Sequence, residues 1–309
     1  LQLKLTATDA HNMQKQTAWA NRNVQTALDA AEIAARRDAL LHRLGEALTL
    51  ENAQMRFAVS KQTGSFLLYD LATGVVWSSG VQTNGVGTAS YQHGDQQHTL
   101  VLTAPDAAEL ENGKIHLNWT RSCGSFDVYF EQLPDGNGIS ASYTAAPADG
   151  WTLTSVTPLD HALWTLDTEN GYAAVPESIG KLYYADGSEQ FNKVYQTYGN
   201  YSMAFAGAVK DGSAMLIDWT DPDTALNVHH SRIDSPYAGG SDQLSFSLSM
   251  TQHSGAFQMR VLGKGGYVQI AKAYRAAASA RGLVRAFAQK AQENPDVAKL
   301  YGAATAKPD

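Results

Sequence analysis

The chain has 309 residues, 44% of them hydrophobic and 17% charged, and a formal net charge of −7. This composition allows a large buried core and excludes a mainly disordered chain. No basic stripe suits nucleic acid, and no apolar run approaches the ~20 residues of a membrane-spanning helix. The single cysteine, Cys123, excludes a disulfide framework within the chain.

The first predicted element is a long helix from about Asp9 to Leu44, within an N-terminal region of residues 1–46. Neither Pro nor Gly occurs there before Gly45, and good helix formers dominate. Small and apolar residues recur at three- and four-residue steps and form a thin stripe. Two uses of this helix stay open. It packs along the rest of the protein, or it forms an interface with another domain or a second copy of the chain.

Residues 47–262 change to short β segments separated by tight turns. Met55, Phe57 and Val59 alternate with other residues, and similar short segments follow as far as Phe257–Leu262. The turns Pro134-Asp135-Gly136 and Lys210-Asp211-Gly212 are typical of hairpins. Strands without intervening helices indicate antiparallel sheets. We therefore expect a mainly β chain with a large antiparallel β-supersandwich, a long N-terminal helix and C-terminal connector helices.

The tail, residues 263–309, returns to helix. Tyr267 to Ala280 has one apolar face, Gly282 interrupts the pattern, and Leu283 to Gln292 resumes it. Asn294-Pro295 is a cap followed by proline at the first helical position. We interpret this tail as a connector toward a catalytic barrel that the chain does not contain.

Four residues of the first hairpins carry a resemblance to a known family. Gly64, Asp70, Gly74 and Trp77 follow a pattern of turn glycine, aspartate and Gly-x-x-Trp. This resembles the galactose-mutarotase-like supersandwich that precedes the (β/α)8 barrel in several retaining glycoside hydrolases, including α-galactosidase-like and endo-α-N-acetylgalactosaminidase-like enzymes. The tail from Tyr267 to Arg275 is similar to their connector. The resemblance implies that the catalytic carboxylates lie on the barrel, so no catalytic residue is assigned here.

The densest acidic cluster is Asp218-Trp219-Thr220-Asp221-Pro222-Asp223. It is either a solvated strand end and turn or a loop that contacts a sugar. Ca²⁺ needs 6–8 oxygen ligands, more than this cluster supplies, so we expect no metal. We also expect no cofactor.

His229 and His230 lie at the end of a predicted strand. Adjacent strand residues point to opposite faces, so only one of them can face a site, and we expect one packed and one exposed. An aldose epimerase would need such a histidine acid with a carboxylate base.

Aromatic residues crowd the region from Tyr183 to Phe205, where Tyr198-Gly199-Asn200-Tyr201 combines two rings and an amide. Rings stack on sugar C–H faces and amides bind hydroxyls. The alternative is packing in the core or against the barrel. The candidate sugar-binding residues are Tyr198, Asn200, Tyr201, Asp218, Trp219 and His229.

Three functions remain open at this point. The first is an accessory domain of a glycoside hydrolase, which braces the catalytic barrel of the same enzyme and lends a loop to its sugar site. The second is a stand-alone aldose epimerase. The third is a non-catalytic module that binds carbohydrate or assembles through the N-terminal helix. All three imply a carbohydrate or a protein partner, and the expected location is periplasmic or secreted.

Overall fold

The computed structural model describes residues 30–80, 85–196, 200–233 and 240–301, and four short backbone segments before residue 22. Those segments are β1 (Gln2–Leu3), β2 (Thr6–Thr8), β3 (Gln14–Gln16) and β4 (Ala20–Asn21), and they pair β1 with β4 and β2 with β3. The helices are α1 (Ala30–Leu44), α2 (Tyr267–Ala280) and α3 (Phe287–Glu293), with 3₁₀ turns η1 (Asp167–Glu169) and η2 (Pro295–Leu300).

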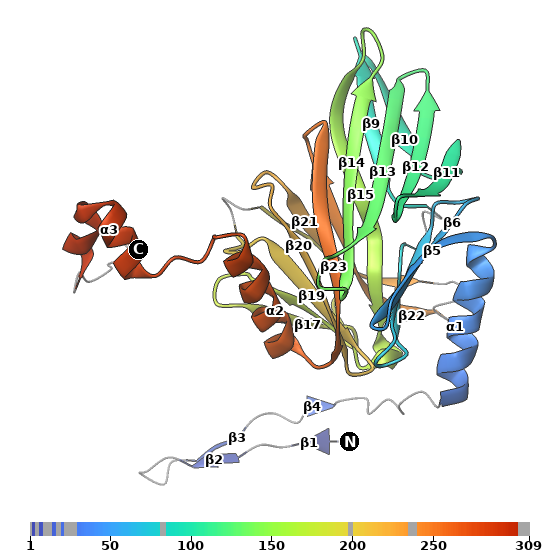
Figure 1. The fold of residues 1–309 in the computed structure, drawn as a ribbon. Coiled ribbons are helices and arrows are strands. Elements are labelled where there is room, and N and C mark those ends of the chain that lie inside the picture. The colour runs from blue at the N-terminus through green and yellow to red at the C-terminus, as the bar shows by residue number, and fades with distance from the viewer. Residues whose placement is uncertain are drawn as a thin grey trace.

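The main body is built from strands (Figure 1), which are β5 (Ala47–Glu51), β6 (Met55–Ser60), β7 (Phe66–Asp70), β8 (Val76–Ser78), β9 (Thr88–His93), β10 (Gln96–Val101), β11 (Ala107–Glu111), β12 (Lys114–Arg121), β13 (Gly124–Gln132), β14 (Gly138–Pro147), β15 (Thr152–Leu166), β16 (Tyr172–Val175), β17 (Lys181–Tyr184), β18 (Phe191–Tyr195), β19 (Phe205–Lys210), β20 (Ser213–Trp219), β21 (Ala225–Ile233), β22 (Ser241–Met250) and β23 (Ser254–Lys264). All their pairings are antiparallel, as predicted. Within the described residues they form a nine-stranded sheet (β11-β12-β13-β14-β23-β20-β19-β16-β17), a six-stranded sheet (β10-β9-β15-β22-β21-β18) and a four-stranded sheet (β5-β6-β7-β8).

One core joins all three of these sheets. Residues of most strands point into it, including Phe130 of the nine-stranded sheet, Phe246 of the six-stranded sheet and Phe66 of the four-stranded sheet. The predicted hairpin at Lys210-Asp211-Gly212 is confirmed, with φ +47° at Asp211 and +76° at Gly212. Such a two-residue turn needs positive φ at both positions.

The four-stranded sheet is buried on both faces. Phe57, Phe66 and Trp77 face the common core, whereas Leu67 and Tyr69 face a second cluster. That second cluster is completed by Leu40 and Leu44 of α1 and by Trp164, Leu166 and Ile233 of the six-stranded sheet. Helix α1 therefore covers the outside of the small sheet.

The prediction of one long helix from Asp9 to Leu44 was wrong. Helix α1 begins at Ala30, and residues 14–16 and 20–21 are strands. Helix propensity is a weak guide, because most helical stability in proteins comes from packing of an apolar face. The buried leucines of α1, Leu40 and Leu44, lie in its last two turns.

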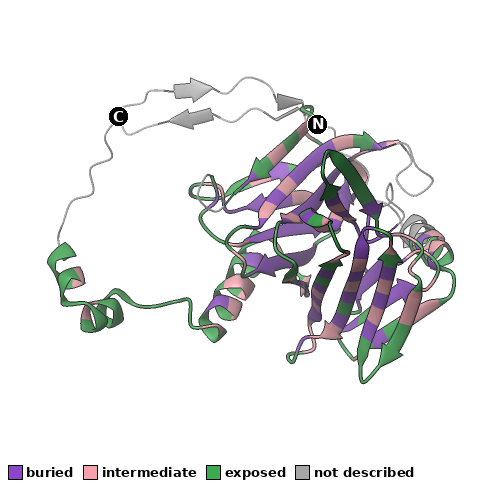
Figure 2. Cartoon of the chain, turned by 90° about the horizontal axis from the view of Figure 1, so that it is seen from above, coloured by how far each residue is buried: buried purple, intermediate pink, exposed green. Residues whose placement is uncertain are grey.

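The first tail helix was predicted more accurately than the second, which begins at Phe287 and not at Leu283. Helix α2 spans Tyr267–Ala280, the predicted range, and Ile270 packs on the outer face of the nine-stranded sheet. A Cβ at Gly207 of β19 would lie 2.6 Å from two carbons of Ile270, so glycine permits this close approach. Beyond α2, residues 281–301 extend away from the body (Figures 1 and 2), and α3 and η2 have no buried residue. Among the described helices none has the length and hydropathy to cross a membrane.

Candidate functional site

Two of the predicted sugar-binding residues lie between the sheets. Tyr201 is 5% exposed and Trp219 is 2% exposed, and both belong to the common core. Their rings meet edge to face with centroids 5.9 Å apart, and the Tyr201 hydroxyl donates to the carbonyl oxygen of Thr224 over 2.8 Å. Both side chains are thus occupied by packing in this structure.

Asn200 and Asp218 already have protein partners. The Asn200 amide donates to the carbonyl of Val194, and its oxygen accepts from the backbone N–H of Gln196. Asp218 is fully buried and pairs with Arg281, just after α2, over 3.2 Å. Tyr198 lies outside the described residues.

His229 is the predicted residue that meets other chemically active groups. Its Nε2 lies 2.9 Å from the Ser247 hydroxyl, which donates to Asp160 Oδ1 over 2.7 Å. The same carboxylate oxygen lies 2.8 Å from His161 Nδ1, and the two imidazole rings stack with centroids 4.0 Å apart. We call these four side chains the Asp160–His229 cluster.

A β-bulge brings the cluster together. Leu159 of β15 pairs with Leu248 of β22, but the next pair joins Ala162 to Phe246. Two residues of β15, Asp160 and His161, therefore stand opposite the single residue Ser247. His161 has φ +46°, in the left-handed region that a non-glycine residue rarely adopts in a strand. Bulges of this kind redirect side chains and are common beside functional sites.

The hydrogen bonds define the proton positions in the cluster. The single Ser247 proton goes to Asp160, so His229 must donate from Nε2 and keep its lone pair on Nδ1. His161 donates from Nδ1 to the carboxylate, which leaves its Nε2 as the basic nitrogen when the ring is neutral. Asp160 thus orients His161 as a carboxylate orients the histidine of a catalytic dyad.

Burial and hydrogen bonding determine the charges of His229 and Asp160. Burial lowers the pKa of His229 to about 4, with the neighbouring His161 acting in the same direction, so this imidazole is neutral at pH 7. Burial opposes ionisation of Asp160, but hydrogen bonds from His161 and Ser247 outweigh it and hold the pKa of that carboxyl below its usual range. The cluster therefore holds a neutral imidazole, His229, and an ionised carboxylate, Asp160, both hydrogen-bonded to the Ser247 hydroxyl.

The cluster lies on a polar sheet face. Asn227 and Thr157 both reach the hydroxyl of Ser249, over 3.2 and 3.4 Å. Along β22, Ser245, Ser247 and Ser249 share this face, while Leu244, Phe246 and Leu248 point into the core. Hydroxyl, amide and imidazole groups are the groups that hydrogen-bond a sugar.

The two adjacent histidines were only partly predicted. They do point to different surroundings, because His230 contacts the carbonyl oxygens of Glu189 and Ala185 away from the cluster. The expectation that one of them is exposed was wrong, since His229 is 9% and His230 1% exposed. Asp160, His161 and Ser247 were missed. The adjacent pair Asp160-His161 was the signal for this site in the sequence. The pair was not recognised as part of a strand, because Val156, Leu159 and Ala162 recur every three residues and a strand alternates every two.

A second polar network lies in the aromatic region. The hydroxyls of Tyr183 and Tyr195 are 2.6 Å apart, and both donate to Glu177 Oε2 over 2.9–3.0 Å. Lys181 and Lys193 stand over the Tyr183 ring. The pKa of Tyr195 is raised, first by burial and then by its two hydrogen-bond partners. This network fixes the loop between β16 and β17.

Across the described residues, no three His, Cys, Asp or Glu side chains are placed to hold a metal ion.

The fold resembles that of solved structures. No family model matches the chain, and no curated protein matches it. The α-N-acetylgalactosaminidase NagBb from Bifidobacterium bifidum aligns in its GalNAc complex with a TM-score of 0.59 and 13% identity, covering 80% of this chain and 41% of that one. A quadruple mutant of NagBb aligns with a TM-score of 0.61 and 13% identity, covering 82% and 42%.

The chain has the galactose-mutarotase-like β-sandwich fold. A putative mutarotase, YeaD from Salmonella typhimurium, aligns more distantly, with a TM-score of 0.38 and 10% identity over 71% of this chain and 94% of that one. The chain spans about two fifths of NagBb, so its likeness is to the β-sandwich portion of a larger glycoside hydrolase. At 13% identity this likeness concerns the fold.

Proposed function

We propose that the chain is the accessory, carbohydrate-associated β-sandwich of a glycoside hydrolase and braces a (β/α)8 catalytic barrel. The observation that carries this proposal is the fold likeness to NagBb over about four fifths of the chain, but only two fifths of that enzyme. The paired carboxylates of glycoside hydrolysis would then lie outside this chain.

The arrangement of the tail supports the proposal. Helix α2 is fixed to the sheet by Ile270 and by the ion pair of Arg281 with the buried Asp218. The segment beyond it presents exposed apolar side chains, among them Leu283, Val284, Leu300 and Tyr301. An exposed apolar segment that follows a helix held on the sheet is suited to a connector that packs against a further domain.

Two measurements test this function. The 309-residue chain should release no nitrophenol from nitrophenyl α-N-acetylgalactosaminide or α-galactoside. The reading frame that encodes it should continue into a barrel with paired Asp or Glu residues at strand ends. Hydrolysis by the chain alone that disappears when one of its own carboxylates is changed would overturn the proposal.

A second candidate, an aldose epimerase, is favoured by the Asp160–His229 cluster. His161 Nε2 can accept the proton of the anomeric hydroxyl while the bond from the anomeric carbon to the ring oxygen breaks. The imidazolium then returns that proton to the ring oxygen, and the open-chain aldehyde can close on either face. Asp160 would stabilise the imidazolium.

Polarimetry of freshly dissolved aldoses separates the two candidates. An epimerase would speed the approach to anomeric equilibrium, and His161→Ala would lower that rate by about 10²-fold or more, the usual contribution of a general base. The exposed His253 is a matched control, and His253→Ala should keep the full rate. An unchanged rate in His161→Ala would exclude the dyad as the catalyst.

A further inference from the structure

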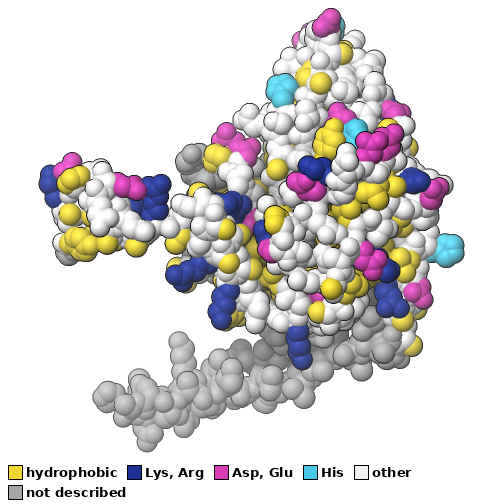
Figure 3. Space-filling model, viewed as in Figure 1, with side chains coloured by type: hydrophobic (Ala, Val, Ile, Leu, Met, Phe, Trp, Pro, Cys, Tyr) yellow, Lys and Arg dark blue, Asp and Glu magenta, His cyan; other side chains and the backbone are white. Residues whose placement is uncertain are grey.

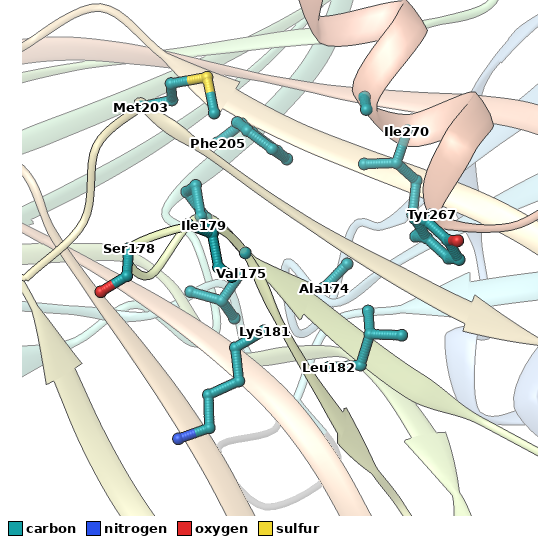
Figure 4. A pocket seen from close by; sticks show the side chains of 13 residues that line it. Ala174, Val175, Ser178, Ile179, Lys181, Leu182, Met203, Phe205, Tyr267 and Ile270 are labelled. Carbon is teal, nitrogen blue, oxygen red and sulfur yellow. The ribbon is translucent and has the colours of Figure 1, made fainter. Parts of the chain in front are cut away.

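An apolar groove of about 610 Å³ lies between the start of α2 and the loop joining β16 to β17. Figure 4 shows Tyr267 and Ile270 of α2 on one side and the side chains of β16, β17 and β19 on the other. The main apolar residues lining it are Val175, Ile179, Met203, Phe205, Tyr267 and Ile270. None of the residues that line the groove belongs to the Asp160–His229 cluster.

The loop beside the groove exposes an isoleucine. Ile179 is fully exposed (104%), and Met203 and Tyr267 nearby are 45% and 55% exposed. The loop around it is held firmly, because Gly180 N–H donates to the Glu177 carbonyl over 2.8 Å and Glu177 binds the two tyrosine hydroxyls. Ile179 is thus presented to solvent by an ordered support, as expected for an interface residue.

The rim of the groove is basic. Helix α2 carries exposed Lys272 and Arg275 and no acidic residue. On the opposite side lies exposed Lys181, which pairs with Glu177 over 3.8 Å. Lys and Arg side chains gather on this part of the surface in Figure 3. In a chain of net charge −7, this local excess of positive charge favours a partner with carboxylates around an apolar ridge.

The course of the chain is a further argument about what occupies the groove. Helix α2 starts at the groove and is roughly 20 Å long, and residues 281–286 then lead to the exposed apolar segment at α3 and η2. A domain joined through this segment would be tethered to α2, which gives it a high effective concentration at the groove. We propose that the groove and Ile179 dock the next domain of the same polypeptide through an apolar, carboxylate-flanked ridge. This inference rests on the proposed function, since it takes that domain to be the barrel.

Thiol labelling tests the surface directly. The natural thiol, Cys123, is buried, so Ile179→Cys adds one accessible thiol. The fluorescein maleimide labelling rate is measured in the 309-residue chain and in the polypeptide extended by its natural downstream sequence. We expect fast labelling in the chain and roughly tenfold or greater slowing in the extended protein, because closed interfaces exclude the reagent. The control is Leu110→Cys on β11, 45% exposed and distant from α2, which should label equally fast in both.

The outcomes separate the two proposals. Equal labelling of Ile179→Cys in an extended protein that hydrolyses glycosides would overturn the docking surface and leave the accessory function intact. Protection in an extended protein without glycosidase activity would support the surface and count against the function. A reading frame with no further domain would overturn the proposed occupant. Protection of Ile179→Cys in the 309-residue chain that grows with protein concentration would also overturn it, and would indicate that a second copy of the chain binds there.

Discussion

At the scale of single residues, the Asp160–His229 cluster depends on neighbours that are distant in sequence. His229 could be singled out as a histidine at a strand end, but its partners come from β15 and β22, and one extra residue in β15 points both Asp160 and His161 at Ser247. Register shifts of this kind arise from pairing across a sheet, not from local propensity.

The cluster predicts a dependence of stability on pH. The pKa of His229 falls from 6.5 to about 4 on folding because of burial and the nearby His161. Between these two pKa values His229 is protonated in the unfolded state and neutral in the folded state. The free energy of unfolding should therefore fall as pH drops from about 6.5 to about 4. The loss should be roughly 3 kcal/mol. His229→Gln keeps an amide donor for Ser247 and should flatten this slope.

Urea denaturation at pH 7.5 and pH 4.5 measures the effect. The depressed pKa of Asp160 has the same sign, but its contribution is lost only as pH falls further, through the folded-state value. His253→Gln, at an exposed site, should retain the wild-type slope. Parallel slopes for wild type and His229→Gln would show that His229 does not titrate as the structure implies.

At the scale of elements, the two flanking helices show what a sequence pattern can and cannot establish. The predicted bounds of α2 were right because Gly266 and Gly282 limit an apolar face that packs on the sheet. The N-terminal helix was predicted too long because good helix formers alone do not maintain a helix. Among the described side chains of that region, Leu40 and Leu44 near its end are the ones that pack against the small sheet.

The anchoring of α2 can be tested at Arg281. Asp218 is fully buried, and burial raises the pKa of its carboxyl, an effect that Arg281 partly offsets. Arg281→Ala would leave that carboxyl buried without its partner and should lower the free energy of unfolding by about 3 kcal/mol. Hydrogen exchange should also quicken along α2. Arg285→Ala breaks an exposed pair with Glu293 and should cost under about 0.5 kcal/mol.

Equal stabilities for Arg281→Ala and Arg285→Ala would show that the ion pair of Arg281 with Asp218 does not hold α2 in place.

At the scale of the whole molecule, the sheets share one core, so they should unfold together. The rings of Phe57 and Phe66, on the small sheet, lie 5.0 and 6.2 Å from Phe130 of the nine-stranded sheet. Contacts of this kind couple elements into one cooperative unit. The small sheet with α1 is therefore part of the sandwich and not a separate module.

Phe66→Ala tests this coupling. The fully buried ring leaves a cavity, and the free energy of unfolding should fall by about 3–5 kcal/mol. Far-ultraviolet circular dichroism and tryptophan fluorescence should still report one coincident transition, since no sheet unfolds alone. Leu71→Ala, 43% exposed at the adjacent turn, should change stability little. Two separate transitions in either variant would contradict the shared core.

The sequence by itself determined the antiparallel β class, the hairpin turns, the bounds of α2 and the resemblance in fold, because alternation and turn chemistry act over a few neighbouring residues. Only the tertiary structure decided that Tyr201 and Trp219 lie in the core, that Asp218 is paired with Arg281, and that α1 begins at Ala30. It also decided that Asp160, His161 and Ser247 join His229, and that Ile179 stands beside a basic-rimmed groove. These features are set by strand register and by packing between residues far apart in the chain, and no local pattern carries that information.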